Sequence, residues 1–275
     1  MNILLFVIGS SPILHQQAHY ALRTIYLNAQ ENDSIYILTD APALYKEIPF
    51  VETIVITEEE IKDWYKDGYF FRIKINAIRK FVQTHTDSHL LFMDCDTYCF
   101  HKLSLISTML NKGYGVLHRD EGSMELMRGD SGKMWQQTKD KTYAGITITN
   151  IYHMWNSGVV GIPRKQVIKV MDKALELCDA FLNDHITCFN LEQWSVSIAL
   201  QQYTPKLLEA DHIIGHYWHH KNVWTKYIFS FFLESYALGR TLKEELHIIG
   251  KTNLPKLATW LAFQRVLMKV FCKIH

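Results

Sequence analysis

The chain lacks most of the features that mark secreted, membrane-spanning or nucleic-acid-binding proteins. Its 275 residues carry a formal net charge of +1, which gives no indication of a nucleic-acid partner. Its five cysteines are odd in number and have no paired CxxC spacing. Free thiols in a reducing compartment are therefore favoured over a disulfide framework or a zinc site. There is no internal repeat and no low-complexity linker.

A long hydrophobic run is also missing from the start of the chain. The apolar stretch Ile3–Ile8 has no basic region before it, and Pro12 follows soon after. Such a stretch is too short for a signal peptide or a membrane-spanning helix. We therefore expect a cytoplasmic protein.

The composition and the first hundred residues favour a large α/β domain. Hydrophobic residues make up 48% of the chain, enough for a sizeable core. Predicted strands alternate there with predicted helices, which is typical of a doubly wound, mostly parallel, Rossmann-like sheet. The predicted strands are Asn2–Gly9, Ser34–Thr39 and Val51–Thr57, and the predicted helices are Ile13–Ala29 and Arg72–Thr84.

The alternation weakens in the second half. Six glycines among charged residues in 113–150 predict long mobile loops. Trp155–Pro163 combines a predicted turn with a short buried strand, and Lys165–Leu182 and Glu192–Gln201 have helical patterns. An aromatic and histidine-rich segment follows at Asp211–Trp224.

The most informative stretch is Leu90–Thr97, an apolar run that ends in Asp94-Cys95-Asp96. Such a run predicts a buried central strand, and ligands bind beyond the carboxyl ends of parallel strands. Side chains two residues apart share one face, so both carboxylates can reach one cation. The motif indicates a divalent ion that bridges a diphosphate, although an ordinary strand-to-turn transition also favours Asp.

Four histidines lie close together further along the chain, next to Lys221: His212, His216, His219 and His220. An imidazole beside two carboxylates suits a manganese-like ion, and Lys221 could neutralise a departing diphosphate. A solvated aromatic patch is the simpler interpretation of any single histidine here.

Two further polar groups are candidates for contacts with a sugar. Asn156-Ser157-Gly158 offers small polar side chains and a permissive backbone, although an ordinary turn would have the same composition. Glu192-Gln193 opens a predicted helix, where a carboxylate is favoured by the helix dipole alone.

Taken in order, these motifs resemble the GT-A-fold glycosyltransferases, and within them glycosyltransferase family eight, the bacterial lipopolysaccharide or capsule galactosyl- or glucosyltransferase type. The resemblance covers about residues 1–222. It implies a GT-A catalytic domain over 1–225, a C-terminal helical region over 226–275, and a Mn²⁺- or Mg²⁺-dependent hexosyltransferase. The implied donor is a nucleotide sugar, most simply a UDP-sugar, and the implied acceptor is a glycan or lipid-linked hydroxyl.

The resemblance also implies roles for individual residues. Asp94, Asp96 and His216 would bind the metal, and Glu192, Gln193 and Asn156 would act on the transferred sugar. The remaining residues implied to bind the nucleotide sugar, together with Asp94, Asp96 and Asn156, are Gly9, Ser10, Asp40, Arg72, Lys74, Cys95, Ser157 and Lys221.

The chain departs from the family pattern at two places. It has Glu192-Gln193 where the family usually has Asp-Gln, which leaves the donor sugar open. It has HYWHHKNVW where the family has His-x-x-Gly-x-x-Lys-Pro-Trp, so His212 or His219 stay open as ligands in place of His216.

The tail has no acidic residue after Glu245. From Pro255 on, apolar residues recur at helical spacing beside a basic stripe of Arg265, Lys269 and Lys273. A basic amphipathic helix suits an anionic bilayer, so we expect peripheral attachment to the cytoplasmic face of the inner membrane. Packing of the same apolar face onto the catalytic domain is the alternative.

Two other functions compete with the transferase. Phosphatases with an aspartate nucleophile share the strand and its Asp-x-Asp, but Gly129-Asp130 is followed by Met134 where their second acidic residue is needed. A non-catalytic carbohydrate-binding protein on a degenerate transferase scaffold would bind sugar without manganese.

Overall fold

The computed structural model describes residues 1–252. The chain divides into two compact units, Met1–Phe232 and Leu233–His275. The amphipathic helix predicted from Pro255 onward lies outside the described residues. Within residues 1–252, no helix is both long and apolar enough to cross a bilayer.

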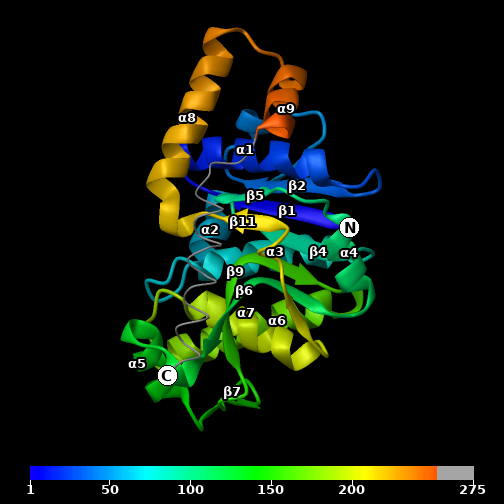
Figure 1. Cartoon of the computed structure of the whole chain (residues 1–275). Helices are drawn as coiled ribbons and strands as arrows, with labels where there is room; N and C mark the ends of the chain where they lie inside the picture. The colour runs from blue at the N-terminus through cyan, green and yellow to red at the C-terminus, as the bar shows by residue number, and fades with distance from the viewer. Residues whose placement is uncertain (253–275) are drawn as a thin grey trace, which may run out of the picture. The chain divides into compact units, whose positions relative to one another are not determined.

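A seven-stranded sheet forms the centre of the first unit, in the order β10-β6-β9-β4-β1-β2-β3 (Figure 1). Strand β9 is antiparallel to both neighbours, and every other pair in the sheet is parallel. This confirms the predicted α/β class with a central, mostly parallel sheet. The strands of this sheet are β1 (Asn2–Val7), β2 (Ser34–Thr39), β3 (Glu52–Val55), β4 (Leu90–Met93), β6 (Gly115–Ser123), β9 (His153–Ile162) and β10 (Leu207–Glu209).

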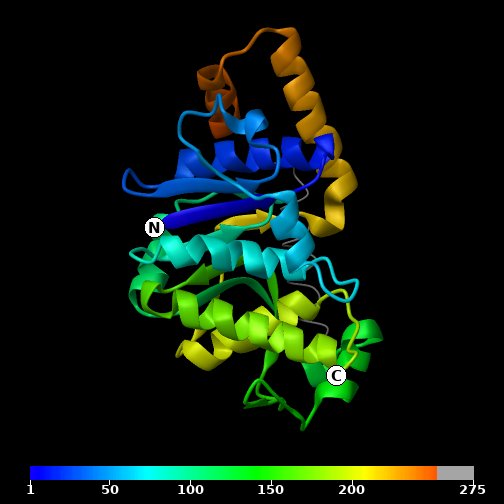
Figure 2. The same cartoon turned by 180° about the vertical axis from the view of Figure 1, so that it is seen from behind.

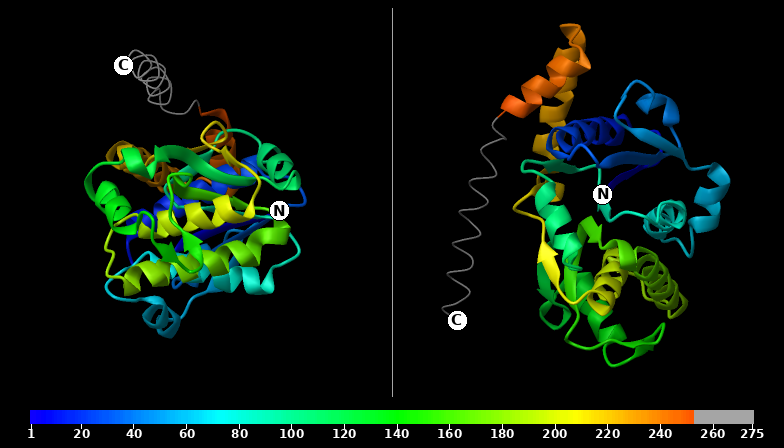
Figure 3. Two further views of the ribbon diagram at one scale, coloured as in Figure 1. Left: turned by 90° about the horizontal axis from the view of Figure 1, so that it is seen from below. Right: turned by 90° about the vertical axis from the view of Figure 1, so that its right-hand side faces the viewer.

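Helices cover both faces of this sheet. Helices α1 (Pro12–Asn28) and α4 (Ser104–Asn111) bury apolar side chains against one face. Helices α3 (Arg72–Thr84), α6 (Val167–Asn183) and α7 (Leu191–Tyr203) pack on the other, with α3 and α6 side by side (Figure 2). Figure 3 shows α1 and α6 on opposite sides of the strands. The two layers arise because neighbouring strand residues, such as Leu4 and Leu5, enter opposite cores.

Smaller elements complete the described chain. Two-stranded sheets pair β5 (Thr97–Cys99) with β11 (Ile214–His216), and β7 (Thr142–Tyr143) with β8 (Ile146–Thr147). The remaining α-helices are α2 (Glu58–Trp64), α5 (Gly129–Thr138), α8 (Lys221–Ala237) and α9 (Leu242–Lys251). Single 3₁₀ turns lie at Pro42–Tyr45, Met124–Leu126, Arg164–Gln166 and Trp218–His220. In the second unit, Thr241 and Glu244 form a capping box at the start of α9.

The prediction of long mobile loops in 113–150 is wrong. The segment contains β6, α5 and the β7–β8 hairpin. Two of its glycines are required by close packing: a Cβ at Gly115 would lie 2.5 Å from the Leu207 side chain, and one at Gly132 would lie 2.5 Å from the Met127 carbonyl oxygen. A glycine count therefore overstated the freedom of this backbone.

The turn predicted within Trp155–Pro163 is also absent. Asn156, Ser157 and Gly158 lie inside β9, a ten-residue strand between β4 and β6. Small polar residues fit an interior strand here because the Asn156 and Ser157 side chains hydrogen-bond to neighbouring groups, as described below.

Candidate metal and donor-binding site

The two carboxylates follow the most deeply buried strand of the sheet. All four residues of β4 are buried, and the ladder with β9 ends where the Asp94 N–H donates to the Gly158 carbonyl at 2.8 Å. Asp96 lies between this strand and β5. Both acidic side chains thus lie at the carboxyl end of the central strand, as the sequence predicts.

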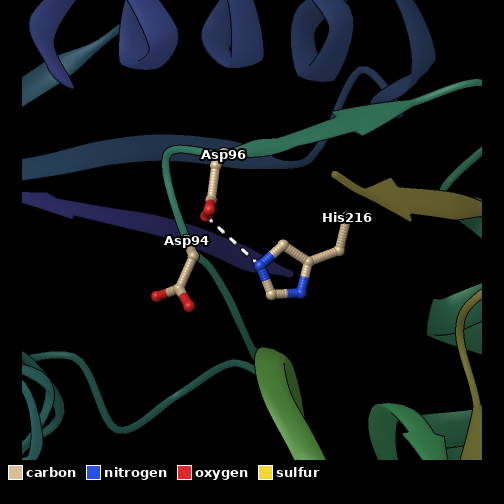
Figure 4. Close-up of side chains that lie close together, drawn as sticks. All are labelled: Asp94, Asp96 and His216. Atoms are coloured by element: carbon tan, nitrogen blue, oxygen red, sulfur yellow. Dashed lines mark ion pairs between the residues drawn. The ribbon is translucent and has the colours of Figure 1, made fainter. Parts of the chain in front are cut away.

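Backbone pairing brings the distant histidine to them. Strand β11 is antiparallel to β5, with His216 opposite Thr97, and the Tyr217 N–H donates to the Asp96 carbonyl at 3.2 Å. The His216 side chain then meets Asp96, with Nε2 3.2 Å from Oδ1 (Figure 4). One ligand atom from each of Asp94, Asp96 and His216 lies within 4.8 Å of the other two.

Hydrogen bonds to the Asn156 side chain fix the orientation of the His216 imidazole. The Gly158 N–H donates to the Asn156 side chain at 3.1 Å, so the accepting atom is the amide oxygen Oδ1. His216 Nδ1 lies 2.9 Å from the same oxygen and must therefore donate to it. Nε2 is therefore the nitrogen that faces Asp96, at 3.2 Å, and the one that can bind a cation beside it. Two carboxylates and an imidazole oriented in this way fit Mn²⁺ or Mg²⁺.

The Asp96 carboxylate contacts two nitrogen groups, the His216 imidazole and the Lys221 ammonium. Burial would raise its pKa, but the His216 imidazole and the Lys221 ammonium outweigh burial and hold the pKa well below its usual range. Lys221 Nζ lies 2.9 Å from Asp96 Oδ2, and its side chain is half exposed. This lysine can leave the carboxylate for an incoming anion without being pulled from the core.

A buried lysine links the metal site to Glu192. Lys74 on α3 lies 3.0 Å from Asp94 Oδ1 and 3.5 Å from Glu192 Oε1, and donates to the Ser157 carbonyl at 3.1 Å. Burial opposes its charge, yet the Asp94 and Glu192 carboxylates raise the pKa of Lys74. Burial also raises the pKa of Glu192. The ammonium therefore balances part of two carboxylates in a region with little water.

Glu192, Gln193 and Asn156 form one network on the β9 side. Ser157 Oγ donates to Glu192 Oε2 at 3.1 Å, and the Ser157 N–H donates to Gln193 Oε1 at 3.3 Å. Glu121 on β6 accepts from Gln193 Nε2 at 2.9 Å and from Asn156 Nδ2 at 3.1 Å. Glu192 Oε1 is buried and accepts no hydrogen bond within residues 1–252, and the cation beside it is the Lys74 ammonium at 3.5 Å.

These groups open into one cavity of about 640 Å³. Its walls are polar on one side and aromatic or aliphatic on the other, where Phe70, Phe71, Phe189 and Trp218 lie. The predicted site residues that line it are Lys74, Asp94, Cys95, Asp96, Asn156, Ser157, Glu192, Gln193, His216 and Lys221.

Four predicted residues lie elsewhere. The Gly9 N–H donates to both carboxylate oxygens of Asp40, at 3.0 and 3.1 Å, so these two residues meet after β1 and β2. Neither they nor Ser10 line the cavity, although Ile8 does. Arg72 is bidentate with Asp179 of α6, at 2.6 and 3.1 Å, and points away from the cavity lining. Helix α3 thus presents Lys74 to the site and uses Arg72 in packing.

The alternative histidine ligands do not join the cluster. His212 is exposed and lies 3.9 Å from Asp211, and His219 stacks on Trp218. The group of potential metal ligands found within residues 1–252 contains His216.

Sequence reasoning missed Glu121 and Tyr69. Glu121 lay in the segment interpreted as loops, where strand alternation was not applied. The Tyr69 hydroxyl accepts from the Glu192 N–H at 2.7 Å and donates to the Phe189 carbonyl at 2.9 Å. A tyrosine that joins two loops has no local sequence signal.

Gly158 offers a test of the ligand arrangement, because a Cβ there would lie 2.3 Å from the His216 ring. We expect Gly158→Ala to displace the imidazole, weaken Mn²⁺ binding by about tenfold or more, and cost about 1–3 kcal/mol of stability. Mn²⁺ titration calorimetry and thermal unfolding measure the two effects. The matched control is Gly161→Ala on the same strand, whose Cβ would meet Val116 at 2.9 Å. It should lose stability and keep its Mn²⁺ affinity; equal metal affinities in both variants would contradict the arrangement.

No family model matches this chain, and no curated protein matches its sequence.

Proposed function

We propose that the protein is a metal-dependent glycosyltransferase of the GT-A type, which moves a hexose from a nucleotide sugar, most simply a UDP-sugar, to a hydroxyl of a glycan or glycolipid. The observation that carries this proposal is the convergence of Asp94, Asp96 and His216 at one end of a cavity whose next residues are Lys221, Asn156 and Glu192. A cation site, a half-exposed lysine and side-chain amides are groups that can bind a diphosphate-linked sugar.

The cavity is large enough for such a donor. Binding cavities for small molecules typically measure about 300–1,000 Å³, and this one has about 640 Å³. The coarse fold is compatible with the proposal as well, since the carboxylates follow a central strand of a mostly parallel sheet.

The reaction breaks the bond between the sugar and the diphosphate. Asp94, Asp96 and His216 would hold Mn²⁺ or Mg²⁺, and such an ion would supply positive charge to the leaving phosphate. Lys221 adds a positive contact to the same phosphate, since its ammonium already lies at the rim of this site.

On the sugar side, the Glu192 carboxylate lines the cavity beside the Lys74 ammonium. The Asn156 and Gln193 amides are held in place by Glu121 and can orient sugar hydroxyls. Fixed polar groups of this kind bind the transferred hexose without reorganising during the reaction.

The proposed acceptor and location follow from the sequence of the tail. A lipid-linked acceptor at the cytoplasmic face of the inner membrane is compatible with the basic, amphipathic pattern in 253–275.

Thermal unfolding with UDP, with Mn²⁺, and with both together tests the proposal. We expect a shift in midpoint that needs both ligands, because the diphosphate and the carboxylates share one cation. The carboxylate control is Asp130→Asn, which is exposed and pairs with Lys133 in solvent, and should shift like the wild type. If neither UDP nor Mn²⁺ shifted the midpoint, alone or together, the result would favour the non-catalytic carbohydrate-binding protein.

A further inference from the structure

A second pocket lies on the same two strands as the candidate donor site. Strands β6 and β9 pair Asp120 with Trp155, next to Glu121 and Asn156. Glu121 and Asn156 line the first cavity, whereas Asp120 and Trp155 line a separate pocket of about 450 Å³. On β9, the successive residues Trp155 and Asn156 thus line different pockets, in keeping with the alternation of side chains in a strand.

The pocket combines an aromatic surface with planar polar groups. Trp155 is half-buried and packs in part against the core, and Tyr152 and Ile151 lie beside it. The remaining lining residues are Asp120, His153, Gln201, Gln202, Thr204, Pro205, Lys206 and Leu207.

Some of its polar groups are already used to build the pocket. His153 Nδ1 lies 3.0 Å from an Asp120 carboxylate oxygen, and Tyr152 donates to Gln202 Oε1 at 3.0 Å. Gln201 holds the His153 backbone through both its N–H and its carbonyl. The orientation of the wall is therefore fixed before any ligand binds.

Other groups are left for a ligand. Within residues 1–252, His153 Nε2, Gln202 Nε2 and Lys206 Nζ have no hydrogen-bond or ion-pair partner. Ile151 is 71% exposed and lines the same pocket as Trp155, so the pocket has an apolar surface open to solvent. An apolar surface bordered by two donors, Gln202 Nε2 and Lys206 Nζ, and by an acceptor, His153 Nε2, suits a ligand with an apolar face and hydroxyl groups at its edge.

We infer that this pocket is a second saccharide-binding site, separate from the donor cavity, that holds one hexose unit of a neutral glycan. A hexose has a face of C–H groups that can stack on the Trp155 indole. Hydroxyls at its edge can accept from Gln202 and Lys206 and can donate to His153 Nε2. Asp120 and Lys206 carry opposite charges, so the pocket has no excess charge that would demand an ionic ligand.

The inference does not depend on the proposed transferase, and its test separates the two. Saturation-transfer NMR titrations of the full chain use lactose, cellobiose, maltotriose and triacetylchitotriose as probes. We expect at least one of these sugars to bind. Its affinity should fall by about tenfold or more in Trp155→Ala, fall less in Gln202→Ala, and largely survive in Trp155→Phe, which keeps an aromatic ring.

The donor site supplies the control. Binding of the sugar should persist in Asp96→Asn and in the presence of saturating UDP and Mn²⁺, because neither touches the second pocket. Failure of all four sugars to bind would overturn the inference. So would loss of binding in Asp96→Asn together with full binding in Trp155→Ala. Gln202 is exposed, so Gln202→Ala reports on the pocket even if Trp155→Ala folds poorly.

Discussion

Replacement of Asp96 by Asn is expected to lower metal-dependent turnover of the nucleotide sugar by about 10³-fold. The amide keeps the volume of the side chain but removes the charge that both His216 and Lys221 approach, at 3.2 and 2.9 Å. With one carboxylate fewer, Asp94 and His216 would be the protein ligands left to hold the proposed cation. The rate of UDP formation at saturating Mn²⁺ measures the loss of turnover. Calorimetry measures the accompanying fall in Mn²⁺ affinity.

The control for this variant is again Asp130→Asn, which removes an exposed carboxylate paired with Lys133. It should keep turnover within about twofold of the wild type, since exposed pairs contribute little. If Asp96→Asn kept wild-type turnover and metal affinity, the proposed cation site would be wrong.

The carboxylate pair could be predicted from the sequence because its position depends on local features. A buried apolar strand that stops before Asp94 places both acidic residues beyond the carboxyl end of that strand, and this placement depends on local sequence alone. The bounds of β2 and α3 are also those predicted, since β2 is a short apolar run that polar residues bound and α3 has apolar residues one helical turn apart. The choice of His216 among several histidines depends on the pairing of β11 with β5, over a hundred residues apart, which spacing alone does not reveal.

The networks around the carboxylates were harder to predict, for two physical reasons. Glycines in 113–150 indicated loops, yet Gly115 is needed because Leu207 packs where a Cβ would lie. Arg72 and Lys74 share a helix and a charge, but two residues along a helix turn a side chain to another face. Arg72 therefore meets Asp179 on α6, and Lys74 meets Asp94.

Lys74 is the buried cation that pairs with two carboxylates of the site, Asp94 and Glu192. Its side chain is 7% exposed and lies between Asp94 and Glu192, the latter 6% exposed. Its ammonium also lies 4.8 Å from the centre of the Phe92 ring. A buried carboxylate that has lost its cationic partner destabilises the folded state far more than an exposed carboxylate does.

We expect Lys74→Met to reduce the free energy of unfolding by about 3–5 kcal/mol at pH 8, because it leaves Glu192 and Asp94 without their shared cation. Denaturant titration measures the change. Burial already raises the pKa of Glu192, and loss of the ammonium raises it further. A carboxyl group with a raised pKa in the folded state destabilises that state as pH rises above its unfolded pKa of about 4.3. The deficit of Lys74→Met relative to the wild type should therefore be smaller at pH 5 than at pH 8.

The matched control is Lys80→Met on the same helix, whose ammonium pairs with Glu60 at 2.7 Å but is one-third exposed. Its cost should stay within about 1 kcal/mol and should change little between pH 5 and pH 8. Two results would contradict the view that the buried Lys74 ammonium compensates the Glu192 carboxylate. One is an equal loss of unfolding free energy in both variants, and the other is a Lys74→Met deficit that is no smaller at pH 5 than at pH 8. The stability of the fold and the charge of the candidate site are thus coupled through one side chain, since the Lys74 ammonium pairs with both Asp94 and Glu192 beside the cavity.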